Sequence, residues 1–311
     1  MDENRPSETK PATDYREDMR RLVIAISQYG KKFDKNFIVI PQNGFEFITK
    51  DGSASGELRQ SHLCAVSAVG AESLFYGYPG DDEPAHADAS EYMLKLCRLY
   101  AQNGVRVLAT DYCSAASDVD ASYRRSKENG FICFAADKRD LTAVQKYPNA
   151  PYNANAKDIK TVADAENFLY LINSEKFSTK RQLIDALKNT DYDMDLFHFI
   201  KAYAESESKG AQNKMQRREA ARDLLYEHRG AEDYRYYWNG AWKTGKPSWL
   251  AEKNPHWKGN YVVKYRDVDW QKIITGNDGL YQKKILDAGF DGAYLDIIDA
   301  FEYFEKESAH R

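Results

Sequence analysis

The chain has 311 residues, a formal net charge of −4 and an aromatic content of 13%. This length suits one large α/β domain or two smaller ones. Acidic and basic residues are well mixed along the chain, which argues against a nucleic-acid binder held by a basic surface.

Apolar runs alternate with helical patterns through the first half of the chain. Residues 1–17 are polar and lack a signal-peptide pattern, so we expect a disordered lead. The apolar runs cover residues 37–40, 64–78, 105–113 and 131–137, and the helical patterns cover 18–29, 91–102 and 117–129. This alternation predicts βα units and a parallel sheet. No run is long enough to span a membrane.

Polar side chains stand at or near the carboxyl ends of these runs. Gln42 and Asn43 follow the first run, Glu72 lies inside the second, and Asp111 falls near the end of the third. In a β/α barrel, the loops at the carboxyl ends of the strands build the active face. The alternatives are turn chemistry for the two amides and an ordinary surface position for Glu72.

The second half of the chain is less regular. Residues 147–164 are rich in Pro, Asn and Ala and read as a linker or crossing segment. The strand pattern restarts at 167–173, and a helix is expected over 178–187. Residues 205–229 are highly charged, and we expect a basic helix over 213–227.

A short apolar run near the C-terminus ends on two carboxylates, Asp296 and Asp299. Buried parallel strands have this character, with polar residues at the C-terminal tip. The two aspartates have a catalytic or sugar-binding role in one interpretation. In the other, they only cap the following helix.

Several segments together resemble glycoside hydrolase family 114, the endo-α-1,4-polygalactosaminidase-like proteins. They are residues 40–44, 230–238, 257–261 and 289–296, and the resemblance covers 18–142 and 165–304. It implies a single (β/α)8 TIM barrel over residues 18–305, followed by a tail at 306–311. It also implies an endo-acting glycosidase that cleaves galactosamine-containing polysaccharide with a carboxylate pair.

The resemblance places the catalytic pair on Asp296 and Glu72. Glycosidic cleavage needs an acid and a second carboxylate as nucleophile or base, and which residue is which stays open. The expected substrate-binding residues are Asp299, Asp111, Gln42, Asn43, Tyr76, Tyr294, Tyr234, Arg235 and Trp238. Core packing is the alternative for each aromatic residue. We expect no metal or cofactor, because the cysteines form no CxxC pair and the histidines show no metal-ligand spacing.

The chain departs from the family in the order of its segments. In the family, the segment like 167–173 comes first, and the segment like 18–142 follows the strand that resembles 292–296. The chain therefore resembles a circular permutant in which residues 143–165 join the old ends. Barrel termini lie close together, so such a rotation is physically tolerable.

Residues 205–229 depart from the family in sequence. The family has an apolar strand here that ends in Ser-Ile-Gly-Glu. Codons for residues 213–229 read one base later permit a similar strand. We therefore hypothesise a local frameshift, and we expect one barrel strand around 213–229 to be disrupted.

Two other functions compete with the glycosidase. One is a catalytically impaired carbohydrate-binding barrel, which the disrupted segment favours. The other is aminoacyl-tRNA chemistry, suggested only by a "cysteinyl-tRNA synthetase-related" label on some family members; the chain lacks the nucleotide-binding motifs and basic surface that it needs. We expect a monomer whose partner is a polysaccharide or an amino-sugar oligosaccharide, without nucleic acid or membrane. Family members are often secreted, but the chain shows no export signal, so its localisation stays open.

Overall fold

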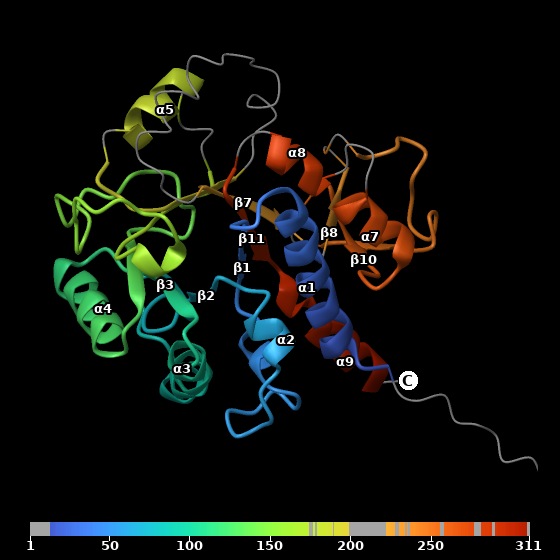
Figure 1. Ribbon diagram of the computed structural model, residues 1–311, viewed down its shortest axis with the longest axis horizontal. Coiled ribbons are helices and arrows are strands. Elements are labelled where there is room, and N and C mark those ends of the chain that lie inside the picture. Colours follow the sequence, from blue (N-terminus) through green and yellow to red (C-terminus); the bar gives the residue numbers. More distant parts are fainter. Residues whose placement is uncertain are drawn as a thin grey trace, which may run out of the picture.

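The structure of the chain is a computed structural model, and it has a mixed α/β fold (Figure 1). It describes residues 13–173, 177, 179–188, 190–198, 222–227, 230–233, 235, 237–255, 258–276, 281–287 and 290–309. Two parallel sheets and one antiparallel sheet carry the strands, and helices pack around them.

The larger parallel sheet has the strand order β1-β11-β7-β6-β5, and the smaller one has the order β2-β3-β4. The strands of the first are β1 (Ile38–Pro41), β5 (Leu169–Leu171), β6 (Asp195–His198), β7 (Arg222–Glu227) and β11 (Gly292–Asp296). Those of the second are β2 (Ala68–Glu72), β3 (Arg106–Tyr112) and β4 (Ile132–Ala136). The antiparallel sheet, in the order β8-β10-β9, contains β8 (Gly230–Glu232), β9 (Leu250–Lys253) and β10 (Asn260–Val263).

Strands β1 and β2 lie side by side and connect the two parallel sheets. Gln42 and Gly70 form an isolated parallel bridge, and the Ser67 N–H donates to the Val39 carbonyl at 2.8 Å. Parallel strands therefore neighbour one another in chain order, from β1 to β4 in one direction and from β11 back through β7 to β5 in the other. No ladder joins β4 to β5 among the described strands, so the structure does not show a closed barrel.

Side chains of the parallel strands divide between two buried clusters. One cluster takes side chains from both parallel sheets, among them Ile40, Leu108, Phe134, Leu196 and Tyr294. The other lies on the helix side and takes their sequence neighbours, such as Val39 and Val107. Because successive side chains of a strand point to opposite faces, this division follows from the strand period of two.

Helices pack around the sheets. They are α1 (Tyr15–Phe33), α2 (Gln60–Leu63), α3 (Ala87–Gln102), α4 (Ala116–Glu128), α5 (Lys180–Lys188), α7 (Val268–Thr275), α8 (Tyr281–Asp287) and α9 (Phe301–Ala309). Most of them lie on the outer cluster, with α4 on a small separate cluster and α5 on the first one. Helix α3 packs against β2 and β3, α4 against β4, and α8 against β11. The strands and helices expected up to residue 137 are thus confirmed, with boundaries shifted by a few residues.

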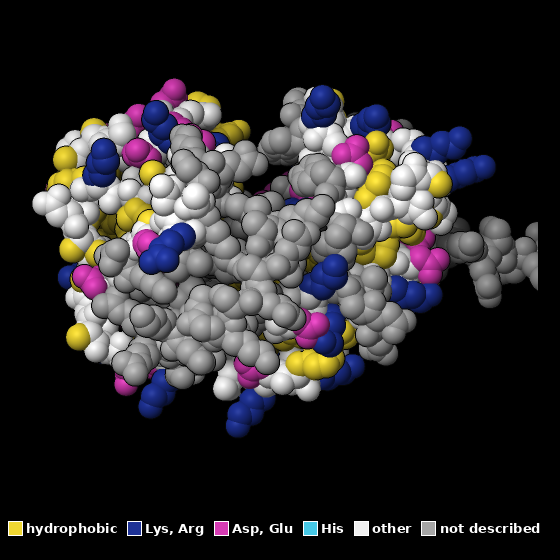
Figure 2. Space-filling view, turned by 90° about the horizontal axis from the view of Figure 1, so that it is seen from above, with side chains coloured by type: hydrophobic (Ala, Val, Ile, Leu, Met, Phe, Trp, Pro, Cys, Tyr) yellow, Lys and Arg dark blue, Asp and Glu magenta, His cyan; other side chains and the backbone are white. Residues whose placement is uncertain are grey.

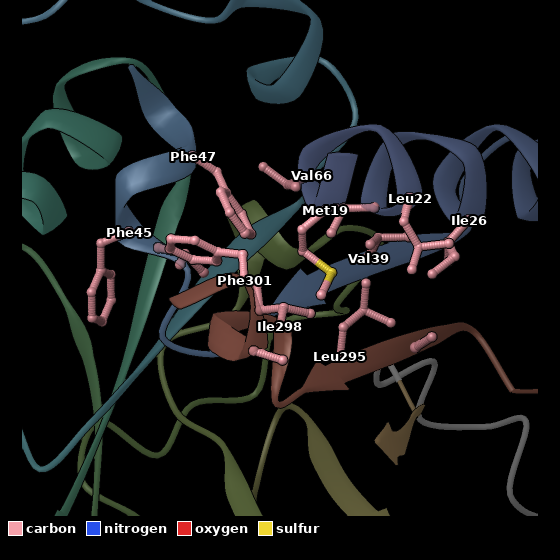
Figure 3. Close-up of a cluster of buried hydrophobic side chains, with 14 of the residues drawn as sticks. Met19, Leu22, Ile26, Val39, Phe45, Phe47, Val66, Leu295, Ile298 and Phe301 are labelled. Atoms are coloured by element: carbon pink, nitrogen blue, oxygen red, sulfur yellow. The ribbon is translucent and has the colours of Figure 1, made fainter. Parts of the chain in front are cut away.

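Helix α1 shows how the apolar pattern builds this core. Met19, Leu22 and Ile26 recur at helical spacing and are fully or almost fully buried. They lie beside Val39 of β1 and Leu295 of β11 in one hydrophobic cluster (Figure 3). Full burial of such side chains contributes about 1.5–3 kcal/mol each.

The basic helix expected over 213–227 is wrong in its described part. Arg222–Glu227 is strand β7, which pairs in parallel with β6 on one side and β11 on the other. Ladders on both sides outweigh the local charge pattern, and the apolar and aromatic residues at 224–226 suit a strand. The sheet thus contains a strand where disruption was expected; residues 213–221 lie outside the described part.

Two boundaries also differ from the expected ones. Helix α1 begins at Tyr15, before the end of the expected disordered lead, because the Asp14 carboxylate accepts from the Glu17 N–H at 2.8 Å and caps the helix. Helix α9 continues to Ala309, where a tail was expected from 306. The joining segment 143–165 is irregular apart from the short 3₁₀ helix Val162–Asp164.

Charges are interspersed on the surface. In Figure 2, Lys and Arg side chains alternate with Asp and Glu side chains around the face that is drawn. Within the described ranges, no helix combines the length and the apolar character that crossing a bilayer requires.

Candidate functional site

Polar side chains converge at the carboxyl ends of β11, β1 and β2. These three strands are consecutive neighbours and run parallel, so their last residues meet at the same edge. Asp296 ends β11 and Glu72 ends β2, while Gln42 directly follows β1 between them. The structure thus brings the two expected catalytic carboxylates to one edge, flanking β1.

Gln42 joins both flanking strands through its side-chain amide. Its Nε2 donates to Glu72 Oε2 at 3.2 Å, and its Oε1 accepts from the Tyr294 hydroxyl. Gln42 is only 1% exposed, so these bonds satisfy an amide that is shielded from water. Because the carboxylate accepts and the phenol donates, the amide is held in one orientation.

Asn43 serves the turn after β1. Its backbone adopts the left-handed conformation (φ 60°), which asparagine tolerates better than most residues. Its Oδ1 accepts from the Glu72 N–H at 3.0 Å, and its own N–H donates to the Gly70 carbonyl at 3.0 Å. Turn chemistry therefore accounts for Asn43, and this chemistry fixes the backbone of Glu72.

The Glu72 carboxylate is surrounded by hydrogen-bond donors from different strand ends. Besides the amide of Gln42, the Tyr112 hydroxyl donates to its Oε1 at 2.5 Å. Arg139, which follows β4, donates from Nη1 to the same oxygen at 3.2 Å. The side chain remains 26% exposed, so a ligand can still reach it.

Buried tyrosines connect the two carboxylates. Tyr170 of β5 and Tyr294 of β11 pack with ring centroids 5.4 Å apart. Burial raises the pKa of Tyr170 well above its usual value, and the negative charges of Asp296 and Glu72 raise it further. The Tyr170 hydroxyl therefore stays protonated. Burial, followed by the charge of Glu72, likewise raises the pKa of Tyr112.

Asp296 sits at a strained turn. Its Oδ1 accepts from the Ile297 N–H at 2.8 Å, and Ile297 has a left-handed backbone (φ 56°). A β-branched residue in this region costs about 1–3 kcal/mol, and such strain gathers at functional sites. Asp299 follows, half-buried, in the 3₁₀ helix Ile298–Ala300. The bond from the Ile297 N–H at the start of this short helix is the kind of contact that the capping interpretation of Asp296 expects.

Asp111 points to the opposite face of β3 from Tyr112. It is fully buried, with Oδ1 accepting from the Phe75 N–H at 2.8 Å and Oδ2 accepting from the Ser122 hydroxyl at 2.5 Å. Burial raises its pKa, and these hydrogen bonds oppose the rise. Asp111 therefore fastens the loop after β2 to helix α4, and the structure does not bring it to Glu72.

Tyr76 also lies toward helix α4. It packs beside Cys113 and Tyr123 in a small buried cluster. Burial raises its pKa, and the charge of Asp118 on α4 raises it further. The ring is thus accounted for by packing on this side of the β3–β4 sheet.

The last group of expected binding residues belongs to the antiparallel sheet. Arg235 pairs with Glu232, and their side chains are 8% and 6% exposed. Trp238 packs against Trp242 and Tyr261, with centroids 5.3 Å and 4.9 Å away. None of these described contacts reaches Glu72 or Asp296, and Tyr234 lies outside the described residues.

Comparison with known proteins gives relatives without an assigned function. No known family description matches the chain. An uncharacterised protein of Methanocaldococcus jannaschii is 34% identical over 158 residues, which are 48% of this chain and 44% of that protein. Uncharacterised proteins of Thermotoga maritima and Deinococcus radiodurans are 48% identical over 77 residues and 40% over 81, covering 25% and 26% of this chain and 23% and 25% of their own lengths. The matches thus span less than half of each of these relatives.

Sequence reasoning missed Tyr112, Tyr170 and Arg139. Tyr112 is adjacent to Asp111, so finding it required the register of β3 to be known to one residue. Tyr170 sits inside an apolar run and carries no polar signal. Arg139 lies in a loop, where no periodic pattern indicates the direction of a side chain.

The described part of the chain shows no candidate metal-binding site. No group of three or more His, Cys, Asp and Glu side chains is placed there to hold an ion. The four cysteines are free thiols, and burial raises the pKa of Cys97, Cys113 and Cys133. Two carboxylates at one edge are the kind of arrangement that acid–base or nucleophilic catalysis uses.

Proposed function

We propose that the chain is an endo-acting glycoside hydrolase that cleaves galactosamine-containing polysaccharide, as its resemblance to glycoside hydrolase family 114 implies. The observation that carries the proposal is the placement of Glu72 and Asp296. They end the two strands that flank β1, so both lie at the same edge of neighbouring parallel strands. Two carboxylates on one rigid edge are the minimum that glycosidic cleavage requires.

The proposal includes closure of the parallel strands into a (β/α)8 barrel. Two observations support closure: the strands neighbour one another in chain order, and one buried cluster receives side chains from both parallel sheets. A permuted barrel also needs helices α1 and α9 to meet. Tyr15 stacks on Phe304 with centroids 5.6 Å apart, and Arg16 pairs with Glu305 at 3.6 Å.

In the proposed reaction, one carboxyl group protonates the leaving oxygen while the other acts as nucleophile or base. Gln42 and Tyr112 hold the Glu72 carboxylate in a fixed orientation. Asp299 is the nearest further acid in the chain beyond Asp296, and it can bind the ammonium of an amino sugar by a charge-assisted hydrogen bond.

Product analysis tests the proposal. The purified chain is incubated with α-1,4-polygalactosamine and, as a control for amine charge alone, with the β-1,4-linked amino polymer chitosan. We expect oligosaccharides only from the first polymer, detected by mass spectrometry. Binding measured by calorimetry without product would favour the carbohydrate-binding barrel, and neither binding nor product would contradict both.

A further inference from the structure

Arg139 holds several groups around the edge of the candidate site. Its Nη1 lies 3.2 Å from Glu72 Oε1, and its Nε lies 3.3 Å from Asp81 Oδ1 in the loop after β2. Its Nη2 donates to the Gly77 carbonyl and, at 3.3 Å, to Ser73. The backbone N–H of Arg139 donates to the other oxygen of Asp81 at 3.0 Å, so the backbone of this loop residue is held as well.

The guanidinium also lies over the ring of Tyr112. Its central carbon is 4.1 Å from the centroid of the Tyr112 ring, whose hydroxyl binds Glu72. One cation thus separates two carboxylates, Glu72 and Asp81, and covers the tyrosine that holds the first. Further ionisable groups near this region are Tyr170, Tyr294 and Asp296 on the strands, and Asp82 in the loop, whose N–H donates to the Tyr112 carbonyl at 3.0 Å.

We infer that Arg139 is a positioning residue that orients the Glu72 carboxylate and places a positive charge between it and the nearby charge of Asp81. The inference deepens the proposed function and rests on it for its kinetic consequence. Without the guanidinium, Glu72 loses a charge-assisted donor and keeps a like-charged neighbour. Removal of a nearby cation and exposure to a like charge both disfavour the charged form of a carboxylate. The limb of the pH–activity profile that Glu72 sets therefore moves upward, whichever catalytic role Glu72 has.

Three variants separate charge from structure. Arg139→Met keeps an apolar stem on Tyr112 but removes the charge, and we expect the limb to rise by about half to one pH unit, since the side chain is 44% exposed and partly screened. Arg139→Lys restores the charge and should recover most of the shift. Asp81→Asn should move the limb to lower pH, because Arg139 then has Glu72 as its remaining carboxylate partner. Arg181→Met, which removes an exposed arginine of α5 paired with Asp185, is the matched control.

A second readout does not depend on turnover. The carboxyl carbon of Glu72, identified by its loss in Glu72→Gln, is followed by NMR during a pH titration of the parent and each variant. The same ordering of midpoints is expected, with Arg139→Met highest and Asp81→Asn lowest. If the parent cleaves no substrate but the midpoints shift in this order, the proposed function fails and the role of Arg139 stands. Midpoints that coincide in the parent, Arg139→Met and Asp81→Asn would overturn the inference.

Discussion

Gly70 lets two strand ends approach closely enough to share a hydrogen bond. A Cβ at this position would clash with the Tyr294 hydroxyl and with Gln42 Oε1, the two partners of the bond that joins β11 to β1. Because Gly70 has no side chain, there is room beside it for the Gln42 amide, which orients Glu72. The small volume of Gly70 is therefore as necessary for this arrangement as the hydrogen bonds of Gln42.

Gly70→Ala should destabilise the protein by about 1–3 kcal/mol, because overpacking forces well-packed neighbours from their positions. Urea unfolding followed by circular dichroism measures the loss. Gly240→Ala is the control, since a Cβ there meets no atom within 4 Å. Equal stability of the two variants would mean that Tyr294 and Gln42 do not occupy the space beside Gly70.

His62 makes stability depend on pH. It is fully buried, its Nε2 lies 2.9 Å from the Tyr100 hydroxyl, and burial lowers its pKa to about 3. In the unfolded chain, histidine titrates near 6.5. Between these values unfolding takes up a proton, so this residue lowers the free energy of unfolding by about 1.4 kcal/mol for each unit that the pH falls below 6.5.

The stability advantage of the parent over His62→Gln should therefore shrink as the pH falls from 6.5 toward 4. Denaturant unfolding at several pH values measures this difference. The exposed His86 supplies the control, His86→Gln. A constant difference between the parent and His62→Gln across this range would show that His62 is already protonated in the folded protein.

Strand-end polarity explains which site residues could be predicted from the sequence. Gln42 and Asp296 follow or end apolar runs, whereas Glu72 lies inside one and was selected through the family resemblance; the structure places all three at one edge. Asp111 has the same signal, but it faces the helices, because the pattern fixes the strand and not its register. The role of Arg139 could not be predicted, because the sequence of a loop has no periodic pattern that indicates where its side chains point.

At the scale of elements, β7 completes the larger sheet. It pairs with five residues of β11 from Gly292 to Asp296 and with four residues of β6 from Asp195 to His198. The sequence around it predicts a basic helix, because charges dominate residues 205–229. The conformation of β7 is set by pairing with β6 and β11, which are distant in the sequence. A local sequence pattern cannot reveal such pairing.

Leu224→Pro tests the position of β7. Proline removes a backbone donor, and a strand paired on both sides uses its donors in ladders. We expect a loss of about 3 kcal/mol or more, measured by thermal and denaturant unfolding. Leu224→Val is the matched control, because it keeps the donor and suits a strand. Equal stability of the two variants would place residue 224 outside the sheet.

At the scale of the whole molecule, α/β alternation could be predicted from the sequence, whereas closure could not. Alternating apolar runs and helical patterns indicate parallel strands. Closure depends on whether the edge strands β4 and β5 of the two parallel sheets meet. A local sequence pattern contains no information about this long-range contact. Strands β11 and β1 pair in parallel although they come from opposite ends of the chain, and the helices next to them in the chain, α9 and α1, pack against each other.

A rotation of the chain order should therefore preserve the fold. A variant joined by a short linker between residues 309 and 13, and reopened between the exposed Asn149 and Ala150, should keep the parent's circular dichroism. Its free energy of unfolding should stay within about 2 kcal/mol, because exposed irregular segments tolerate new ends. Reopening the joined chain inside β3, between Ala109 and Thr110, is the control and should abolish folding. Loss of folding in the first variant would contradict the arrangement of α1 and α9.

The most direct test of the central claim, that Glu72 and Asp296 form the catalytic pair, is the rate of product release from polygalactosamine by Glu72→Gln and Asp296→Asn. Each should lower kcat at least about 100-fold while binding is retained, since each removes a group that transfers a proton or forms a bond in the reaction. Glu91→Gln, at an exposed position of α3 paired with Lys95, should match the parent. Product release at the parent's rate by either site variant would contradict the claim.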